Sequence, residues 1–319
     1  MSGDARETGA GRAPDRPSRL GGRAWWGVLR RTVREFGDDK LTDWAAALTY
    51  YAVLSIFPGL LVLVSVLGLV GAPALQPLID NMGTIAPGPV GQILTDGARG
   101  LTEAQGAAGI LAIVGAAGAL WSASGYIAAF MRAANAIYDV PEGRPFWKTV
   151  PIRLGVTIVI GVLLAVSAFM VVLTGDLAER VGDAFGVGSV LVTAWGIVKW
   201  PILVVIVSQM FALLYWATPN ARQGGYRWIS PGGLLAVVLW MVASAGFAVY
   251  VANFGSYNKT YGVLGGVIIF FVWLWISNVA ILLGAEFDAE LHRARAIEAG
   301  HPADREPYVE LRDTRTLDD

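Results

Sequence analysis

The feature that most constrains this chain is an uncharged apolar run over residues 261–285, YGVLGGVIIFFVWLWISNVAILLGA. As a helix, a segment of this length extends about 37 Å, whereas the hydrocarbon core of a bilayer is about 30 Å thick. The run is followed directly by the charged residues Glu286, Asp288, Glu290 and Arg293. This change of composition indicates an exit into water. We therefore expect a transmembrane helix over 261–285.

The composition agrees with a membrane protein and excludes several site chemistries. Of 319 residues, 55% are hydrophobic and 15% are charged, a balance too apolar for a soluble domain. The absence of cysteine excludes disulfides, thiolate metal sites and cysteine nucleophiles. The first long apolar run begins near Trp44, too late and too long for a cleaved signal peptide. We expect that run to remain in the mature protein.

The apolar runs together predict an all-α polytopic membrane protein, a bundle of six transmembrane helices occupying 41–292. The spans are expected over about 44–70, 107–137, 151–174, 188–217, 230–254 and 261–285. Pro58 and Pro201 lie inside the first and fourth spans, where proline removes a backbone hydrogen bond and kinks a helix. Broken helices at corresponding places in two halves are typical of transporters with inverted repeats, although no sequence repeat accompanies these.

The segments outside the spans are polar. Residues 1–24 predict a disordered basic tail, residues 71–106 two short amphipathic helices, and residues 293–319 a flexible cytoplasmic tail. In 25–40, apolar residues recur at steps of three and four opposite basic ones, as in Trp26, Leu29, Val33 and Phe36. This pattern predicts an interfacial amphipathic helix in the headgroup plane, with a solvated basic helix as the alternative.

Basic residues are distributed unevenly over the predicted links. With six spans, 18 Lys and Arg fall on the side of the two termini, and 3 fall on the other side. The positive-inside rule then places both termini in the cytoplasm.

From the residue types available for catalysis and metal binding, we expect no enzymatic activity and no catalytic residue. We also expect no metal, cofactor or nucleic-acid partner. Both histidines, His292 and His301, lie after the last span without a carboxylate pair beside them, and no P-loop pattern is present. Ionisable residues near the spans are better candidates, because charge within a bilayer is costly. If the fourth span starts near Gly188, Lys199 lies about 16 Å inside it. If the span starts nearer Trp195, Lys199 snorkels to the outer interface.

Two further groups of residues are candidates for function. Arg132, Arg153, Glu286 and Asp288 flank the predicted cytoplasmic ends of three spans, which indicates an ion-pair cluster closing that side. Asn278 lies about two turns before Glu286, where an amide joins helices or lines a pathway. We predict a substrate pathway that includes Lys199, Asn278, Glu286, Pro58 and Pro201.

Two stretches resemble the signatures of a known family. Residues 38–63 (DDKLTDWAAALTYYAVLSIFPGLLVL) and 257–291 (YNKTYGVLGGVIIFFVWLWISNVAILLGAEFDAEL) are similar to those of the YihY/BrkB family of bacterial inner-membrane proteins. The resemblance continues through 134–148, although Asp288 stands where Asn is expected in many relatives. The resemblance implies a six-span bundle. For function, it implies either a part in moving lipid precursors or ion-coupled antiport. A former ribonuclease label of the family is not supported by the inventory of groups.

We therefore predict a transporter or exporter of a lipid or amphiphile in the bacterial plasma membrane. An ion-coupled antiporter and a non-transporting scaffold that recruits partners or anionic lipid are the alternatives. Membrane lipids are the expected partners, and the oligomeric state, including a homo-oligomer, is left open by the sequence.

Overall fold

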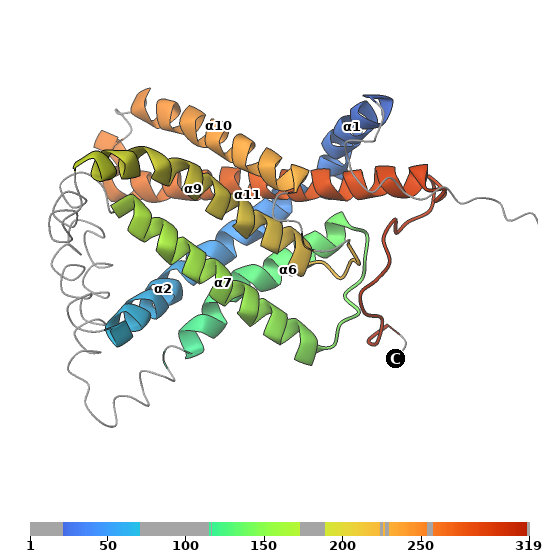
Figure 1. Ribbon diagram of the computed structural model, residues 1–319, viewed down its shortest axis with the longest axis horizontal. Helices are drawn as coiled ribbons and strands as arrows, with labels where there is room; N and C mark the ends of the chain where they lie inside the picture. The colour runs from blue at the N-terminus through green and yellow to red at the C-terminus, as the bar shows by residue number, and fades with distance from the viewer. Residues whose placement is uncertain are drawn as a thin grey trace, which may run out of the picture. The chain divides into compact units, whose positions relative to one another are not determined.

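The computed structural model describes residues 22–70, 115, 117–172, 189–223, 226, 230–253 and 258–317. In these ranges the chain is helical, and its one β-bridge joins Ala221 to Leu311. The helices are shown in Figure 1: α1 (Gly22–Asp38), α2 (Leu41–Val70), α6 (Gly125–Ile137), α7 (Phe146–Val172), α9 (Ser189–Ala217), α10 (Pro231–Asn253) and α11 (Asn258–Glu298). The predicted all-α class is confirmed.

Four helices are long and apolar enough to cross a membrane. They are α7 over Phe146–Val171, α9 over Val190–Ala217, α10 over Pro231–Ala252 and α11 over Gly265–Glu298. The predicted count of six is not confirmed by the described residues. The predicted second span lies partly outside them, since α6 begins at Gly125 and residues 107–114 are not described. The predicted tail 1–24 and link 71–106 also fall largely or wholly outside the described residues.

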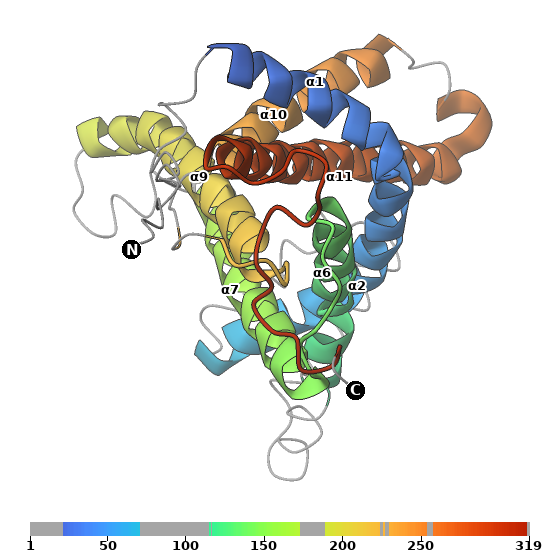
Figure 2. The same ribbon diagram turned by 90° about the vertical axis from the view of Figure 1, so that its right-hand side faces the viewer.

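The observed helix ends differ most from the prediction at α11. This helix does not end with the apolar run but continues to Glu298. Its charged extension contains good helix formers and has a packing partner, because Phe287, Leu291 and Ala294 form a buried cluster with Val28 of α1. α1 lies beside this half of α11 in both views (Figures 1 and 2).

The chain divides into two compact units. One comprises Met1–Ala46, Met131–Phe146 and Phe211–Asp319, and the other comprises Ala47–Phe130 and Trp147–Met210. In the second unit, the Arg153 guanidinium donates to Ser124 Oγ and lies 4.3 Å from the centre of the Trp121 ring. All the residues of the candidate site described below belong to the first unit.

Helices α10 and α11 of the first unit pack closely through glycines. A Cβ atom added at Gly284 would lie 2.5 Å from the Gly232 carbonyl oxygen, closer than real Cβ contacts. The approach is held by polar groups as well. The Gly232 amide of α10 donates to Asp288 Oδ1 of α11 at 2.7 Å. The hydroxyl of Tyr215, at the end of α9, donates to the Ile281 carbonyl of α11 at 2.6 Å.

The C-terminal segment differs from the predicted flexible tail. After α11 the chain returns along its own unit (dark red in Figure 2) and makes specific backbone contacts. Arg312 N–H donates to the Asn220 carbonyl at 2.9 Å, and Arg222 N–H donates to the Glu310 carbonyl at 2.7 Å. The buried Asn220 amide donates to the carbonyls of Pro141 and Asp313. Because these backbone groups are paired, the segment over 308–317 is an integral part of the fold.

Candidate acidic site

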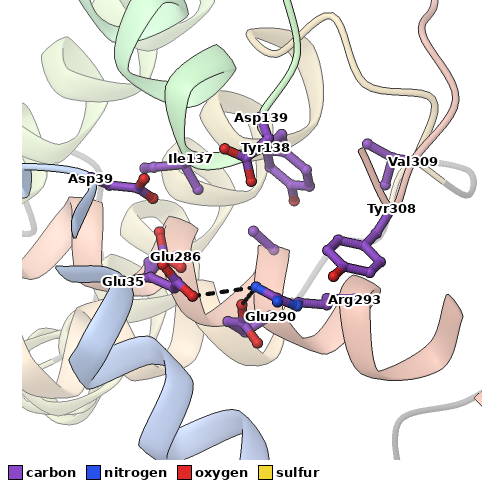
Figure 3. A pocket seen from close by; sticks show the side chains of 11 residues that line it. Glu35, Asp39, Ile137, Tyr138, Asp139, Glu286, Glu290, Arg293, Tyr308 and Val309 are labelled. Carbon is purple, nitrogen blue, oxygen red and sulfur yellow. Dashed lines mark hydrogen bonds and ion pairs between the residues drawn. The ribbon is translucent and has the colours of Figure 1, made fainter. Parts of the chain in front are cut away.

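The first unit contains an open pocket rich in carboxyl groups (Figure 3). It has about 370 Å³ of space, including its open mouth. Its lining residues come from four parts of the chain: Glu35, Asp39, Ile137, Tyr138, Asp139, Glu286, Ala289, Glu290, Arg293, Tyr308 and Val309. Five of these side chains carry a carboxyl group and one carries a guanidinium. The pocket therefore has an excess of potential negative charge.

Two helix ends turn aspartates into this pocket. α1 and α6 are each followed by a non-glycine residue in the left-handed region, Lys40 with φ 52° and Asp139 with φ 51°. After α6, Asp139 N–H bonds the Ala136 carbonyl and Val140 N–H bonds the Asn135 carbonyl. These bonds form a Schellman-type helix end. Asp139 occupies the left-handed position of this motif, which is usually held by glycine or asparagine. The two reversals place Asp39 and Asp139 in the pocket wall.

The lower part of the pocket is held by ion pairs between α1 and α11. Arg293 donates to Glu35 Oε1 and to Glu290 Oε1, both at 3.3 Å (Figure 3). The Arg293 guanidinium also lies 4.5 Å from the centre of the Tyr308 ring. On the other side of Glu290, the Arg31 guanidinium of α1 donates to its second oxygen. Glu35 and Glu290 thus have cationic partners within the fold.

Glu286 has a different environment from Glu35 and Glu290. It is 1% exposed, and its carboxyl group faces that of half-buried Asp39 (Figure 3). A hydrogen bond between two carboxyl groups requires a proton on one of them, since an ionised carboxylate can only accept. Because Glu286 is buried and Asp39 half-buried, two negative charges facing each other here would repel, and this arrangement favours one proton shared by the pair.

Burial and nearby acids perturb the two aspartates in the loops. Burial, with the charges of Glu35 and Asp38, raises the pKa of Asp39 to about 6, although its hydrogen bond with Glu286 acts in the other direction. Burial, with the charge of Glu306, raises the pKa of Asp139 to about 6. Both groups therefore titrate nearer to neutral pH than an exposed aspartate does.

Three buried polar atoms of the pocket lack a hydrogen-bond partner among the described residues, and one of them is Nε of Arg293. Glu286 Oε2 makes no hydrogen bond, and neither does the hydroxyl of Tyr138, a residue that is 6% exposed. Burial, with the charges of Asp288 and Glu286, raises the pKa of the Tyr138 hydroxyl, so the phenol stays neutral. Unpaired buried polar groups are uncommon and point to a missing binding partner.

The structure places the residues of the predicted pathway in different parts of the fold. Lys199 is 2% exposed on α9, and its ammonium lies 5.5 Å from the Trp200 ring. α9 begins at Ser189, so Lys199 lies about 15 Å along the helix from this end, and its position relative to the bilayer stays a prediction. Asn278 is buried on α11, 3% exposed. Pro58 and Pro201 lie inside α2 and α9, and α9 is visibly bent in both views (Figures 1 and 2).

The predicted cytoplasmic cluster of Arg132, Arg153, Glu286 and Asp288 stays a prediction. Arg153 makes its observed contacts in the second unit, with Ser124 and Trp121. Asp288 accepts the Gly232 amide, and Arg132 is exposed. Glu286 is the member of this group that lies in the acidic pocket.

Most of the pocket was missed by sequence reasoning. Glu35, Asp39 and Asp139 are far from Glu286 in the sequence, and Tyr138 and Tyr308 look like ordinary loop aromatics. One usable signal was the spacing of the charged residues Glu286, Glu290 and Arg293, which puts them on a single helical face. Within the described part of the chain, no group of three or more His, Asp or Glu is arranged to hold a metal ion.

These features define a multi-pass, all-helical membrane protein with an acidic pocket beside its last helix. The sequence profile described as Virulence factor BrkB matches residues 32–308. The chain belongs to this BrkB family.

Relatives of the chain come from diverse bacteria. The ribonuclease-like protein YfkH of Bacillus subtilis is 29% identical over 86% of this chain and 96% of its own length. A UPF0761 membrane protein of Aeromonas salmonicida is 30% identical over 80% of this chain and 85% of its own. Another, from Ralstonia nicotianae, is 30% identical over 83% of this chain but 58% of its own length. No solved structure matches the chain.

Proposed function

We propose that this protein is a proton-coupled transporter of the bacterial plasma membrane, and that the Asp39–Glu286 pair holds the coupling proton. The observation that supports this proposal is that the carboxyl group of Asp39 faces that of buried Glu286, where the apolar run of α11 ends (Figure 3). Ionisable groups in such positions are costly and are typical of proton pathways. The pocket around the pair is open, so its proton can exchange with water.

The orientation follows from the charge distribution of the links. The pocket is built from segments on the predicted Lys- and Arg-rich side, namely α1, the turn after α6 and the chain after α11. The positive-inside rule places that side, with both termini, in the cytoplasm. The proton would therefore be loaded and released at the cytoplasmic face.

The outer surface of α1 supports its predicted position in the headgroup plane. Val28 is fully buried against α11, whereas Trp26 and Val33 on the opposite side are 69% and 74% exposed. Exposed Arg30 lies on this outer side. Aromatic and apolar groups combined with arginine suit an anionic membrane surface. A scaffold that recruits anionic lipid would use the same face, and a lipid or amphiphile as the transported substrate stays a prediction.

The test uses the full chain reconstituted in liposomes with an acidic interior and a trapped pH dye. Candidate solutes, including organic cations and amphiphiles, are added outside. The proposal expects at least one solute to accelerate loss of the pH gradient, and Glu286→Gln to abolish the acceleration. A solute flux that continues unchanged in Glu286→Gln and Asp39→Asn would contradict it. A chain that moves no solute and no protons would leave the scaffold as the better account.

A further inference from the structure

The charge balance of the acidic pocket favours a cationic ligand. Arg293 and Arg31 together neutralise Glu35 and Glu290 at one end of the pocket. Asp39, Asp139 and Glu286 line the rest of it, and none of them forms an ion pair with a residue in the described part of the chain. A pocket in which carboxyl groups exceed cations attracts positive charge, and low-dielectric walls strengthen that attraction.

The unpaired oxygen atoms in the pocket restrict the chemical class of the ligand further. Glu286 Oε2 accepts no hydrogen bond, and the hydroxyl oxygen of Tyr138 is also without a partner. Both residues are more than nine-tenths buried and line the pocket. A ligand that brings several N–H donors would satisfy both oxygens. A primary ammonium group carries three such donors, like the side chain of lysine.

The pocket already holds one cation in this manner. The Arg293 guanidinium lies between the carboxylates of Glu35 and Glu290 and over the ring of Tyr308 (Figure 3). Carboxylates around a cation with an aromatic ring at its side are the usual elements of organic-cation recognition. The same elements recur at the other end, where Tyr138 lies with Asp139 and Glu286.

We propose that this second end of the pocket takes the primary ammonium group of an organic cation, in exchange for the proton shared by Asp39 and Glu286. This inference rests on the proposed function and names its substrate class. When the ammonium binds, both carboxyl groups are ionised and the shared proton passes to water. One positive charge enters as one leaves, so binding and deprotonation are coupled without any change in net charge.

The coupling makes ligand affinity depend on pH. The groups that face the shared proton from the surrounding elements are the acids Glu35, Asp38, Asp139, Glu290 and Glu306 and the cation Arg293. Below the pH at which the pair loses its proton, an ammonium must compete with that proton. Its apparent affinity should therefore rise about tenfold per pH unit until the proton is lost, when one proton is exchanged per ligand.

The experiment measures n-butylammonium binding to the full chain in detergent by calorimetry, with proton release followed in weakly buffered solution. We expect about one proton released per ammonium bound. Glu286→Gln should remove both signals, and Tyr138→Phe, which keeps the ring, should weaken binding about tenfold or less. Glu310→Gln is the matched control, because Glu310 is an exposed acid of the same unit. It should bind like the unmodified chain.

Two other cations decide the ligand class. Choline has no N–H donor and should neither bind nor release protons, and sodium ions should not replace the amine. Equal responses to choline or sodium would overturn the ammonium assignment. Absence of any amine response, while Asp39 and Glu286 still share a proton, would overturn this inference alone. If neither an amine response nor a shared proton is detected, both this inference and the proposed function are contradicted.

Discussion

Asp39, in the turn after α1, faces the buried carboxyl group of Glu286 on α11 (Figure 3). In our proposal, a proton shared by the two groups forms a hydrogen bond between the N-terminal segment and the last membrane-length helix. Without that proton, the two ionised carboxylates would repel each other. The N-terminal segment is thus attached to α11 by a bond that is lost when the pair is fully ionised, in addition to the permanent packing of Val28 against Leu291.

Replacing Glu286 tests this bond through stability. A glutamine at 286 can donate to Asp39 at every pH, whereas alanine leaves a cavity and a buried acid without its partner. We expect Glu286→Ala to lower the free energy of unfolding by about 1–3 kcal/mol. Glu286→Gln should be close to neutral. Thermal unfolding in detergent at pH 7 measures both. Equal destabilisation by the two changes would argue against the bond.

The raised pKa of Asp139 predicts a pH-dependent effect of its removal. Its pKa is about 6 in the fold and 3.8 in an unfolded chain. The protonated form is therefore favoured by folding, so this stabilising contribution is complete below pH 3.8 and is lost as the pH rises through about 6. Asp139→Asn should remove that loss. Its melting temperature relative to the unmodified chain should increase from pH 4 to pH 7.

Glu142 provides a control of opposite sign. Burial opposes its ionisation, but the hydrogen bonds and charge of Arg144 outweigh burial and lower the pKa of Glu142 below 4.5. Stability from this ion pair is present above pH 4.5 and is lost as the pH falls through the lowered pKa. Glu142→Gln should therefore destabilise the protein at pH 7 and have less effect in acid. The same pH trend for both variants would contradict these assignments.

The helical class and most spans could be predicted because they depend on local composition. Apolar runs predicted α7, α9 and α10 to within a few residues of their ends. The extension of α11 and the packing of 308–317 could not be predicted, because both depend on partners distant in sequence, Val28 and Asn220. The acidic pocket has the same origin. Glu286 was identified as a candidate from its position, but nothing local in the sequence connects it to Asp39 or Tyr138.

The close contact of α10 and α11 predicts a size limit at Gly284. An added methyl group would meet the Gly232 carbonyl, the Tyr215 hydroxyl and Ala236 at 2.5–2.7 Å. Gly284→Ala should therefore destabilise the protein by about 1–3 kcal/mol through overpacking. Gly266→Ala is the matched control on the same helix, because nothing lies within 4 Å of its added Cβ. It should be neutral or slightly stabilising. Comparable losses at both positions would contradict the packing account, because only Gly284 has neighbours that an added methyl group would meet.

The hydrogen bonds of the Asn220 side chain are expected to hold the C-terminal segment in place. Its side chain bonds the backbone of Pro141 and of Asp313, both distant in sequence. Asn220→Ala leaves these buried groups unpaired, and we expect a loss of about 2 kcal/mol. Hydrogen exchange should become faster over 308–317. Arg222→Gln removes an exposed ion pair of the same region and serves as the control. Unchanged exchange in Asn220→Ala would contradict the attachment.

A protonated Asp39–Glu286 pair at neutral pH is the central claim, and carbodiimide labelling tests it most directly. Dicyclohexylcarbodiimide reacts with protonated carboxyl groups in apolar surroundings, and mass spectrometry locates the adduct. The account predicts labelling at Glu286 or Asp39 at pH 7, its disappearance at high pH, and no labelling of exposed Glu310. Glu286→Gln should leave Asp39 unlabelled. Absence of any adduct on the pair at pH 7, with the protein folded, would contradict the claim.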